Sequence, residues 1–161
     1  MIIIGVGSNL PFCTIDSQQI VLSAISAFAA IGSIASRASL YRSPAWPDPS
    51  HPDYINTVFS ARSDLSPEAL LSALQAIEAG FGRRRSQKNA PRTLDLDIIA
   101  HGDLVTGGSD ETLILPHPRM HERDFVLAPL AEIAPDWRHP VSGARAGDLL
   151  AALPTRTARK L

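Results

Sequence analysis

The chain is poor in the residues from which disulfides and thiolate metal sites are built. It has one cysteine, Cys13, so an intrachain disulfide and a zinc site made of several thiolates are both excluded. We interpret Cys13 as a small residue that fills space in the packed protein.

Long apolar runs are also missing. The best candidate, residues 20–34, is interrupted by serines and a glycine, so no segment matches a membrane span. The first ten residues, MIIIGVGSNL, have neither a basic leader nor an apolar stretch of the length found in signal peptides. We therefore expect a cytoplasmic protein with no membrane partner.

Neither sign of charge prevails. The chain has 15 basic and 16 acidic residues and a formal net charge of −1. This balance argues against a surface adapted throughout to nucleic acid, and we expect no nucleic-acid partner.

What the chain does have is enough apolar material for one core. Hydrophobic residues make up 45% of its 161 residues, and we assign residues 1–161 to a single domain. Residues 2–4 predict a buried strand, residues around 40–42 a second and the alternating residues 54–61 a third. Helical spacing over residues 20–31 follows a cap at Thr14 or Asp16, and Ser66 with Pro67 begins a second helix.

The rest of the chain continues the alternation of strands and helices. Residues 94–99 (LDLDII) predict a strand, residues 113–116 a further short strand, and residues 126–133 and 148–153 two helices. The four prolines in residues 44–52 predict a stiff, extended loop. The order strand, helix, strand, strand, helix, strand is that of a split β-α-β sheet, so we expect an α+β, ferredoxin-like fold with helices packed on the sheet.

Two aspartates carry the strongest chemical signal. Asp95 and Asp97 are two residues apart in a predicted strand, so both project from one face while their apolar neighbours face the other. Two adjacent carboxylates repel each other, and a divalent cation relieves that repulsion. Magnesium takes one or two carboxylates and completes its shell with water and phosphate oxygens. On its own, the pair could equally be an exposed acidic strand.

A basic run lies just upstream of the aspartates. Arg83, Arg84, Arg85, Lys88 and Arg92 could supply guanidinium and ammonium groups to phosphate oxygens that the metal leaves free. Their mutual repulsion predicts that residues 83–90 are mobile without ligand and ordered by a ligand that carries phosphates. Gln75 and Glu78, three residues apart on the preceding helix, could approach the same place.

Several segments make the chain resemble the hydroxymethyldihydropterin pyrophosphokinases of folate biosynthesis. They are GSNL (7–10), LYRSPAW (40–46), PDYIN (52–56), PRTLDLDII (91–99), LPHP (115–118) and RDFVLAPLAEIAP (123–135). The resemblance implies an ATP-dependent transfer of diphosphate to 6-hydroxymethyl-7,8-dihydropterin, which gives AMP and the pterin diphosphate. Two magnesium ions would bridge Asp95 and Asp97 to the ATP phosphates.

The resemblance also implies roles for individual residues. Arg83, Arg92, Asp95 and Asp97 would be catalytic. The pterin would lie between Tyr54 and Phe125, with its polar edge on Asn56 and on backbone groups of Ser43, Pro44, Ala45 and Trp46. The implied ATP-binding residues are Gln75, Glu78, Arg83, Arg85, Arg92, Ile98, His117 and Arg123.

Two other functions compete with this hypothesis. A nucleic-acid module on the same kind of sheet would carry aromatic residues on a strand, whereas this strand carries two aspartates. A metal-dependent phosphohydrolase would need a group that activates water, and no motif indicates one. No serine or cysteine nucleophile motif is present, and no general base is indicated. We expect catalysis by alignment and cation stabilisation in a monomeric enzyme.

Overall fold

In the computed structural model, the described residues are 1–83, 90–107 and 113–161, and within them six strands form one sheet. The strands are β1 (Ile2–Ser8), β2 (Ser33–Arg37), β3 (Tyr41–Ser43), β4 (Tyr54–Arg62), β5 (Asp95–His101) and β6 (Arg159–Lys160). Their order is β5-β1-β4-β3-β6, with β2 also paired to β4, and every pairing is antiparallel. β4 thus separates β1 from β2 and β3, which is the split β-α-β arrangement expected from the sequence.

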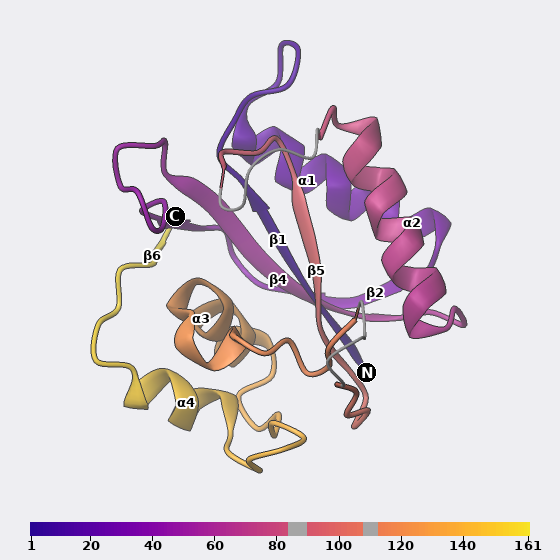
Figure 1. Cartoon of the computed structure of the whole chain (residues 1–161), viewed down its shortest axis with the longest axis vertical. Coiled ribbons are helices and arrows are strands. Elements are labelled where there is room, and N and C mark those ends of the chain that lie inside the picture. The colour runs from indigo at the N-terminus through magenta and orange to yellow at the C-terminus, as the bar shows by residue number, and fades with distance from the viewer. Residues whose placement is uncertain (84–89, 108–112) are drawn as a thin grey trace.

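Helices cover both faces of this sheet (Figure 1). α1 (Ser17–Ala27) and α2 (Pro67–Gly80) pack on one face, and α3 (Asp124–Ile133) and α4 (Ala146–Ala152) lie on the other. Short 3-10 turns follow α1 (Phe28–Ala30) and precede α3 (Met120–Glu122). The α+β fold with helices on a split β-α-β sheet is therefore confirmed.

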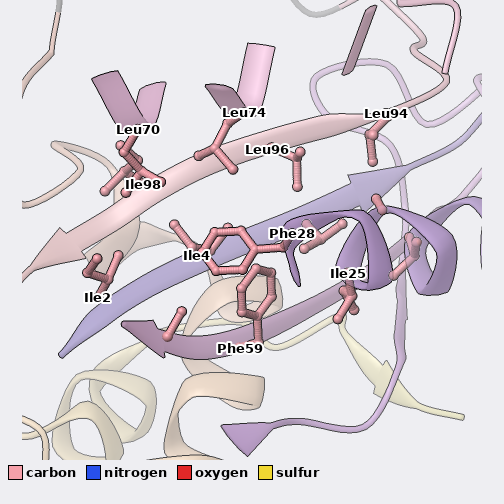
Figure 2. Close-up of a cluster of buried hydrophobic side chains, with 14 of the residues drawn as sticks. Ile2, Ile4, Ile25, Phe28, Phe59, Leu70, Leu74, Leu94, Leu96 and Ile98 are labelled. Atoms are coloured by element: carbon pink, nitrogen blue, oxygen red, sulfur yellow. The ribbon is translucent and has the colours of Figure 1, made fainter. Parts of the chain in front are cut away.

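The larger core lies between the sheet and the pair α1 and α2. Figure 2 shows Leu70 and Leu74 of α2 above Leu96 and Ile98 of β5, and Phe28 against Phe59. The two phenyl rings meet edge to face with centroids 5.0 Å apart, a favoured aromatic geometry. Because side chains alternate along a strand, burying Leu96 and Ile98 here turns Asp95 and Asp97 away from this core.

Both long helices begin as the sequence predicts. Asp16 caps α1 by accepting a hydrogen bond from the Gln19 backbone, and the Gln19 side chain completes a capping box. Ser66 caps α2 through the Ala69 N–H, with Pro67 at the first helical position. α2 therefore starts at a defined residue and carries Gln75 and Glu78 toward β5.

Four details of the sequence prediction were wrong. β2 and β6 were not predicted, because β2 is exposed along its whole length and β6 has only two residues. Residues 113–116 form no strand; Thr106 instead bonds the Leu113 and Leu115 backbones, and Pro116 has no N–H to donate. Cys13 fills no core, since it is exposed in a tight turn with φ 53°.

Within the described part of the chain, no helix combines the length and the apolar character needed to cross a bilayer.

Candidate active site

Two cavities meet at the carboxylates of β5. The larger, of about 390 Å³, is lined by residues of β1, β3, β4, β5 and α3, and the smaller, of about 210 Å³, lies between α2 and β5. Asp95 and Asp97 line both cavities. A molecule in either cavity therefore reaches the same pair of aspartates, as the strand pattern of the sequence predicts.

Asp95 lies between two arginines. Arg83 Nη1 lies 2.6 Å from Asp95 Oδ1, and Arg92 Nη1 lies 3.1 Å from Asp95 Oδ2. Arg83 lies just after α2 and Arg92 just before β5, so two separate segments supply cations to one carboxylate. This carboxylate is neutralised by guanidinium groups, which phosphate oxygens can also engage.

Asp97 has weaker cationic partners. Arg123 Nη1 lies 3.8 Å and His117 Nε2 4.0 Å from Asp97 Oδ2. The Asp97 side chain is 40% exposed toward the cavity, and the surrounding protein, followed by the negative charge of Asp95, raises its pKa to about 7. A carboxylate held in this way favours any cation that enters the cavity.

The His117 ring lies between Arg119, Arg123 and Asp97. Its Nδ1 accepts a hydrogen bond of 3.1 Å from the Arg119 backbone N–H. Burial, together with nearby Arg123, lowers the pKa of His117 to about 4, so the ring is neutral at neutral pH. Its Nε2 faces both Arg123, whose Nη1 lies 3.4 Å away, and Asp97.

Glu78 joins α2 to the edge strand β5. Its Oε1 accepts a hydrogen bond of 2.7 Å from the Leu96 N–H and also contacts Arg83 Nη1. The side chain is only 8% exposed, and burial raises the pKa of this carboxyl. Glu78 thus satisfies an unpaired backbone donor of the edge strand and holds Arg83 beside the aspartates.

The larger cavity brings together the residues that the resemblance assigns to the pterin. Tyr54 and Asn56 follow one another on one face of β4, and Phe125 comes from the first turn of α3. Asn56 Nδ2 donates a hydrogen bond of 2.9 Å to Ser43 Oγ on the neighbouring β3. Gly7 makes room for this group, because a Cβ at residue 7 would lie 2.9 Å from Asn56 Oδ1.

Asn9 holds three loops of the site together. Its Nδ2 donates to the Pro52 carbonyl at 3.0 Å, and its Oδ1 accepts from the Arg92 N–H at 2.8 Å. The Asn9 N–H donates to the Arg92 carbonyl in return. The GSNL segment therefore fixes Arg92 and the start of β4 relative to β1, a role that sequence reasoning did not assign to Asn9.

An exposed aromatic residue stands at the edge of the larger cavity. Trp46 is 62% exposed, and the guanidinium carbon of Arg119 lies 4.7 Å from the centre of its ring. The pair connects the proline-rich loop to the segment before α3, and both residues line the cavity. No local pattern in the sequence pointed to Arg119, since its partner is distant in the chain.

Most of the predicted site residues gather around these two cavities. Gln75, Glu78 and Arg83 line the smaller one. The larger one is lined by Ser43, Pro44, Trp46, Tyr54, Asn56, Arg92, Arg123 and Phe125. Sequence reasoning missed Glu122, Asp124, Thr155 and Thr157, which line it too.

Four predicted residues are not among these. His117 lines neither cavity, although its Nε2 lies 4.0 Å from Asp97 Oδ2. Ala45 is buried, and the Ile98 side chain belongs to the core under α2, so neither side chain lines a cavity. Arg85 and the rest of residues 84–89, on which the mobility of the basic run was predicted, lie outside the described residues.

Comparison with known proteins agrees with this geometry. Residues 3–135 match the model of the 7,8-dihydro-6-hydroxymethylpterin-pyrophosphokinase family. The chain belongs to this family.

Two members of the pyrophosphokinase family illustrate the similarity. A 2-amino-4-hydroxy-6-hydroxymethyldihydropteridine pyrophosphokinase of Synechocystis is 45% identical over 141 residues, which cover 88% of this chain and 70% of that protein. The enzyme of the same name from Haemophilus influenzae is 39% identical over 139 residues, with 86% and 84% covered.

The fold is shared with a longer solved protein. A crystal structure of a Plasmodium falciparum HPPK-DHPS triple mutant matches 93% of this chain with a TM-score of 0.74 at 11% sequence identity. The chain spans 43% of the length of that protein, so the match concerns the pyrophosphokinase fold alone.

Proposed function

We propose that the two cavities receive the two substrates of the family's reaction and that Asp95 and Asp97 mark the place where they react. The chain is an ATP-dependent diphosphotransferase of folate biosynthesis, and it transfers diphosphate from ATP to 6-hydroxymethyl-7,8-dihydropterin. One observation carries the proposed arrangement: both aspartates line both cavities. ATP would enter between α2 and β5, and the pterin would enter the larger cavity.

Asp95 and Asp97 are the residues that would hold magnesium, with two ions expected. The donor set fits, because both are hard oxygen ligands two residues apart on one strand face. Among the described residues, no group of three or more histidine, cysteine or acidic side chains could hold a metal alone. A site with two carboxylates is suited to magnesium that is completed by phosphate and water. When bound, magnesium would neutralise phosphate charge and polarise the phosphorus to be attacked.

The arginines of the site would act on the phosphates. Arg83, Arg92 and Arg123 surround the carboxylates within 4 Å and can each donate forked hydrogen bonds. The neutral His117 ring lies beside Arg123, with its Nε2 3.4 Å from Arg123 Nη1. These groups would hold the phosphorus in line with the pterin hydroxyl and stabilise the negative charge that spreads during transfer, which is how positioned donors accelerate such reactions.

The pterin ring would lie between Tyr54 and Phe125. Arg123 lies 5.6 Å from the centre of the Phe125 ring, so the ring that contacts the pterin also contacts a phosphate-binding arginine. Asn56 donates to Ser43 and keeps its carbonyl oxygen beside Gly7, so this oxygen can accept from the polar edge of the pterin. The backbone of residues 43–46 would supply the remaining contacts.

The nucleotide side depends on the free edge of β5. Leu96 turns its N–H outward to Glu78, and Ile98, two residues further, turns its backbone to the same edge. We therefore assign recognition of the nucleotide to the Ile98 backbone and to Gln75. The Ile98 side chain packs in the hydrophobic core.

We further propose that the enzyme works as a single-domain monomer in the cytoplasm. The last strand, β6, joins the same sheet as the first, which supports a single domain. A free, exposed Cys13 suits a reducing compartment.

Product analysis tests the reaction. The enzyme is incubated with ATP and magnesium, with and without 6-hydroxymethyl-7,8-dihydropterin, and nucleotides are separated. We expect AMP only when the pterin is present; ADP or free phosphate without pterin would instead identify a hydrolase.

Calorimetric titration tests the division of the site. Tyr54→Ala and Phe125→Ala should weaken binding of the pterin far more than binding of an ATP analogue. Aromatic contacts are worth about 0.5–1.5 kcal/mol beyond area burial. An equal loss for both ligands would contradict the sandwich.

A further inference from the structure

A buried aspartate at the start of α3 holds the last part of the chain. Asp124 is only 7% exposed, and its Oδ2 accepts hydrogen bonds from the backbone N–H of Thr157 and, at 2.7 Å, of Ala158. The Thr157 hydroxyl adds a third contact to the same oxygen at 3.3 Å. A buried carboxylate is costly unless it is hydrogen-bonded, and here backbone groups from 33 and 34 residues away provide the bonds.

The segment that it holds lies at the surface. We call residues 154–158 the strap; it runs from the end of α4 past α3 to β6 (Figure 1). Thr155, Arg156 and Thr157 are all exposed, so apolar burial contributes little to their position. Two side-chain hydrogen bonds involve Arg156: its guanidinium donates to the Ala151 carbonyl, and the Arg159 side chain donates to the Arg156 carbonyl. Beyond the strap, β6 pairs with β3.

The strap is also a wall of the larger cavity. Thr155 and Thr157 line this cavity together with Tyr54, Asn56 and Phe125. Neither threonine lines the smaller cavity between α2 and β5. Asp124 itself stands between Arg123 and Phe125, so the residue that holds the strap is part of the turn that presents the stacking ring.

We propose that Asp124 is a positioning residue for the pterin, which acts by holding the strap as one wall of the pterin pocket. This inference rests on the proposed place of the pterin in the larger cavity. If Asp124 is removed, the strap loses its attachment to α3 but stays joined to α4 and β6, so the core and the nucleotide side remain as they are. The pterin pocket then becomes wider and less ordered on one side, while the cavity between α2 and β5 is unchanged.

Kinetics of Asp124→Ala test the proposal. We expect the KM for 6-hydroxymethyl-7,8-dihydropterin to rise about tenfold, the effect of losing roughly one hydrogen bond to a charged group, while the KM for ATP stays within about twofold. Asp124→Asn keeps an oxygen acceptor and should recover most of the pterin affinity. Asp148→Ala, which removes an exposed aspartate from the first turn of α4, should change neither constant.

Amide hydrogen exchange in the ligand-free enzyme provides a readout that does not depend on the pterin. The Thr157 and Ala158 amides should be protected in the wild type and in Asp124→Asn, and exposed in Asp124→Ala. Unprotected amides in the wild type would refute the attachment. In Asp124→Ala, loss of amide protection with an unchanged KM for the pterin would refute the proposal that the strap forms a wall of the pterin pocket. An equal rise in the KM values for pterin and ATP would refute it too.

A second variant covers the case in which Asp124→Ala does not fold. Thr155→Trp adds bulk at an exposed position on the wall and should block the pterin while an ATP analogue still binds with normal affinity. Unchanged pterin binding by a folded Thr155→Trp protein would overturn the proposal. If the wild type bound the pterin analogue no better than a Tyr54→Ala protein, the proposed pterin site itself would fail, independently of the strap.

Discussion

Tyr41 Oη donates a hydrogen bond of 2.8 Å to Glu132 Oε2 and so joins β3 to α3. Burial, followed by this bond, raises the pKa of Tyr41 to about 12. Partial burial acts to raise the pKa of Glu132, but hydrogen bonds from Ser39 and Tyr41 outweigh it and leave the pKa lowered. The same carboxylate also contacts Lys160 of β6 at 3.2 Å.

The pH dependence of stability follows from these two shifts. The Tyr41 pKa is raised above its ordinary value of 10.0. Its contribution to the free energy of unfolding is therefore complete below pH 10.0 and is lost as the pH rises toward 12. The Glu132 pKa is lowered from its ordinary value of 4.5. Its contribution to the free energy of unfolding is therefore complete above pH 4.5 and is lost on acidification. Tyr41→Phe should lower the free energy of unfolding by about 1–2 kcal/mol at neutral pH.

Urea denaturation from about pH 3 to about pH 11 would check this prediction. The alkaline decline should be shallower in Tyr41→Phe than in the wild type, and the acid decline shallower in Glu132→Gln. If the free energy of unfolding changed with pH in the same way in the wild type, Tyr41→Phe and Glu132→Gln, the pair would not be the source of the pH dependence.

Gly7→Ala should impair the pterin side of the site. The added Cβ would meet Asn56 Oδ1 at 2.9 Å and the Tyr54 ring at 3.6 Å, so the amide must move away from Ser43. We expect weaker binding of the pterin, by about tenfold if one hydrogen bond is lost, and unchanged affinity for an ATP analogue. Gly80→Ala is the matched control, because a Cβ there meets no atom within 4 Å.

The two aspartates should respond differently to loss of charge. Asp95→Asn and Asp97→Asn should both abolish most turnover, because each removes an expected magnesium ligand. Without metal, Asp97→Asn should keep or raise the thermal midpoint, since it removes a carboxylate whose ionisation its surroundings oppose. Asp95→Asn should lower the midpoint, because Arg83 and Arg92 lose their shared partner.

Thermal unfolding in a chelator, together with turnover in magnesium, checks both variants. Near-normal turnover of either would contradict the metal assignment. Equal thermal midpoints for Asp95→Asn and Asp97→Asn would contradict the proposal that Asp95 has stronger cationic partners than Asp97.

Glu78→Gln and Glu78→Ala separate the two tasks of this side chain. Glutamine keeps an acceptor for the Leu96 N–H but loses the charge that holds Arg83, whereas alanine loses both. We expect both variants to bind ATP more weakly, but only alanine to be destabilised, by about 1–3 kcal/mol for an unsatisfied buried donor. Paired measurements of nucleotide affinity and urea unfolding check this, and equal stability of the two variants would refute the backbone role.

The fold was predictable because its main elements have strong local signals. The caps Asp16 and Ser66 begin α1 and α2 as expected, and the alternation in LDLDII separates the buried leucines from the aspartates. β2 and β6 could not be predicted, because their residues are exposed and gain order only by pairing with β4 and β3. Such strands depend on their partners and not on their own pattern.

The site was predictable where its residues share a short motif. Arg92, Asp95 and Asp97 lie within the single segment PRTLDLDII, and the strand period places both carboxylates together. The contacts of Asn9, Arg119 and Asp124 were missed for one reason: their partners lie far away in the chain. Hydrogen bonds and cation–π contacts across such separations leave no periodic signal in the sequence.

The position of β5 at the edge of the sheet has a consequence for the protein's behaviour in concentrated solution. Unpaired backbone groups on an edge strand invite a second copy to add its own strand, and many proteins block such edges to avoid aggregation. Here Glu78 occupies the Leu96 N–H, and the proposed nucleotide site covers the groups that follow. A nucleotide in that position would serve the chain twice, as a reactant and as a shield against self-association, so the enzyme should be most prone to aggregate when nucleotide is scarce.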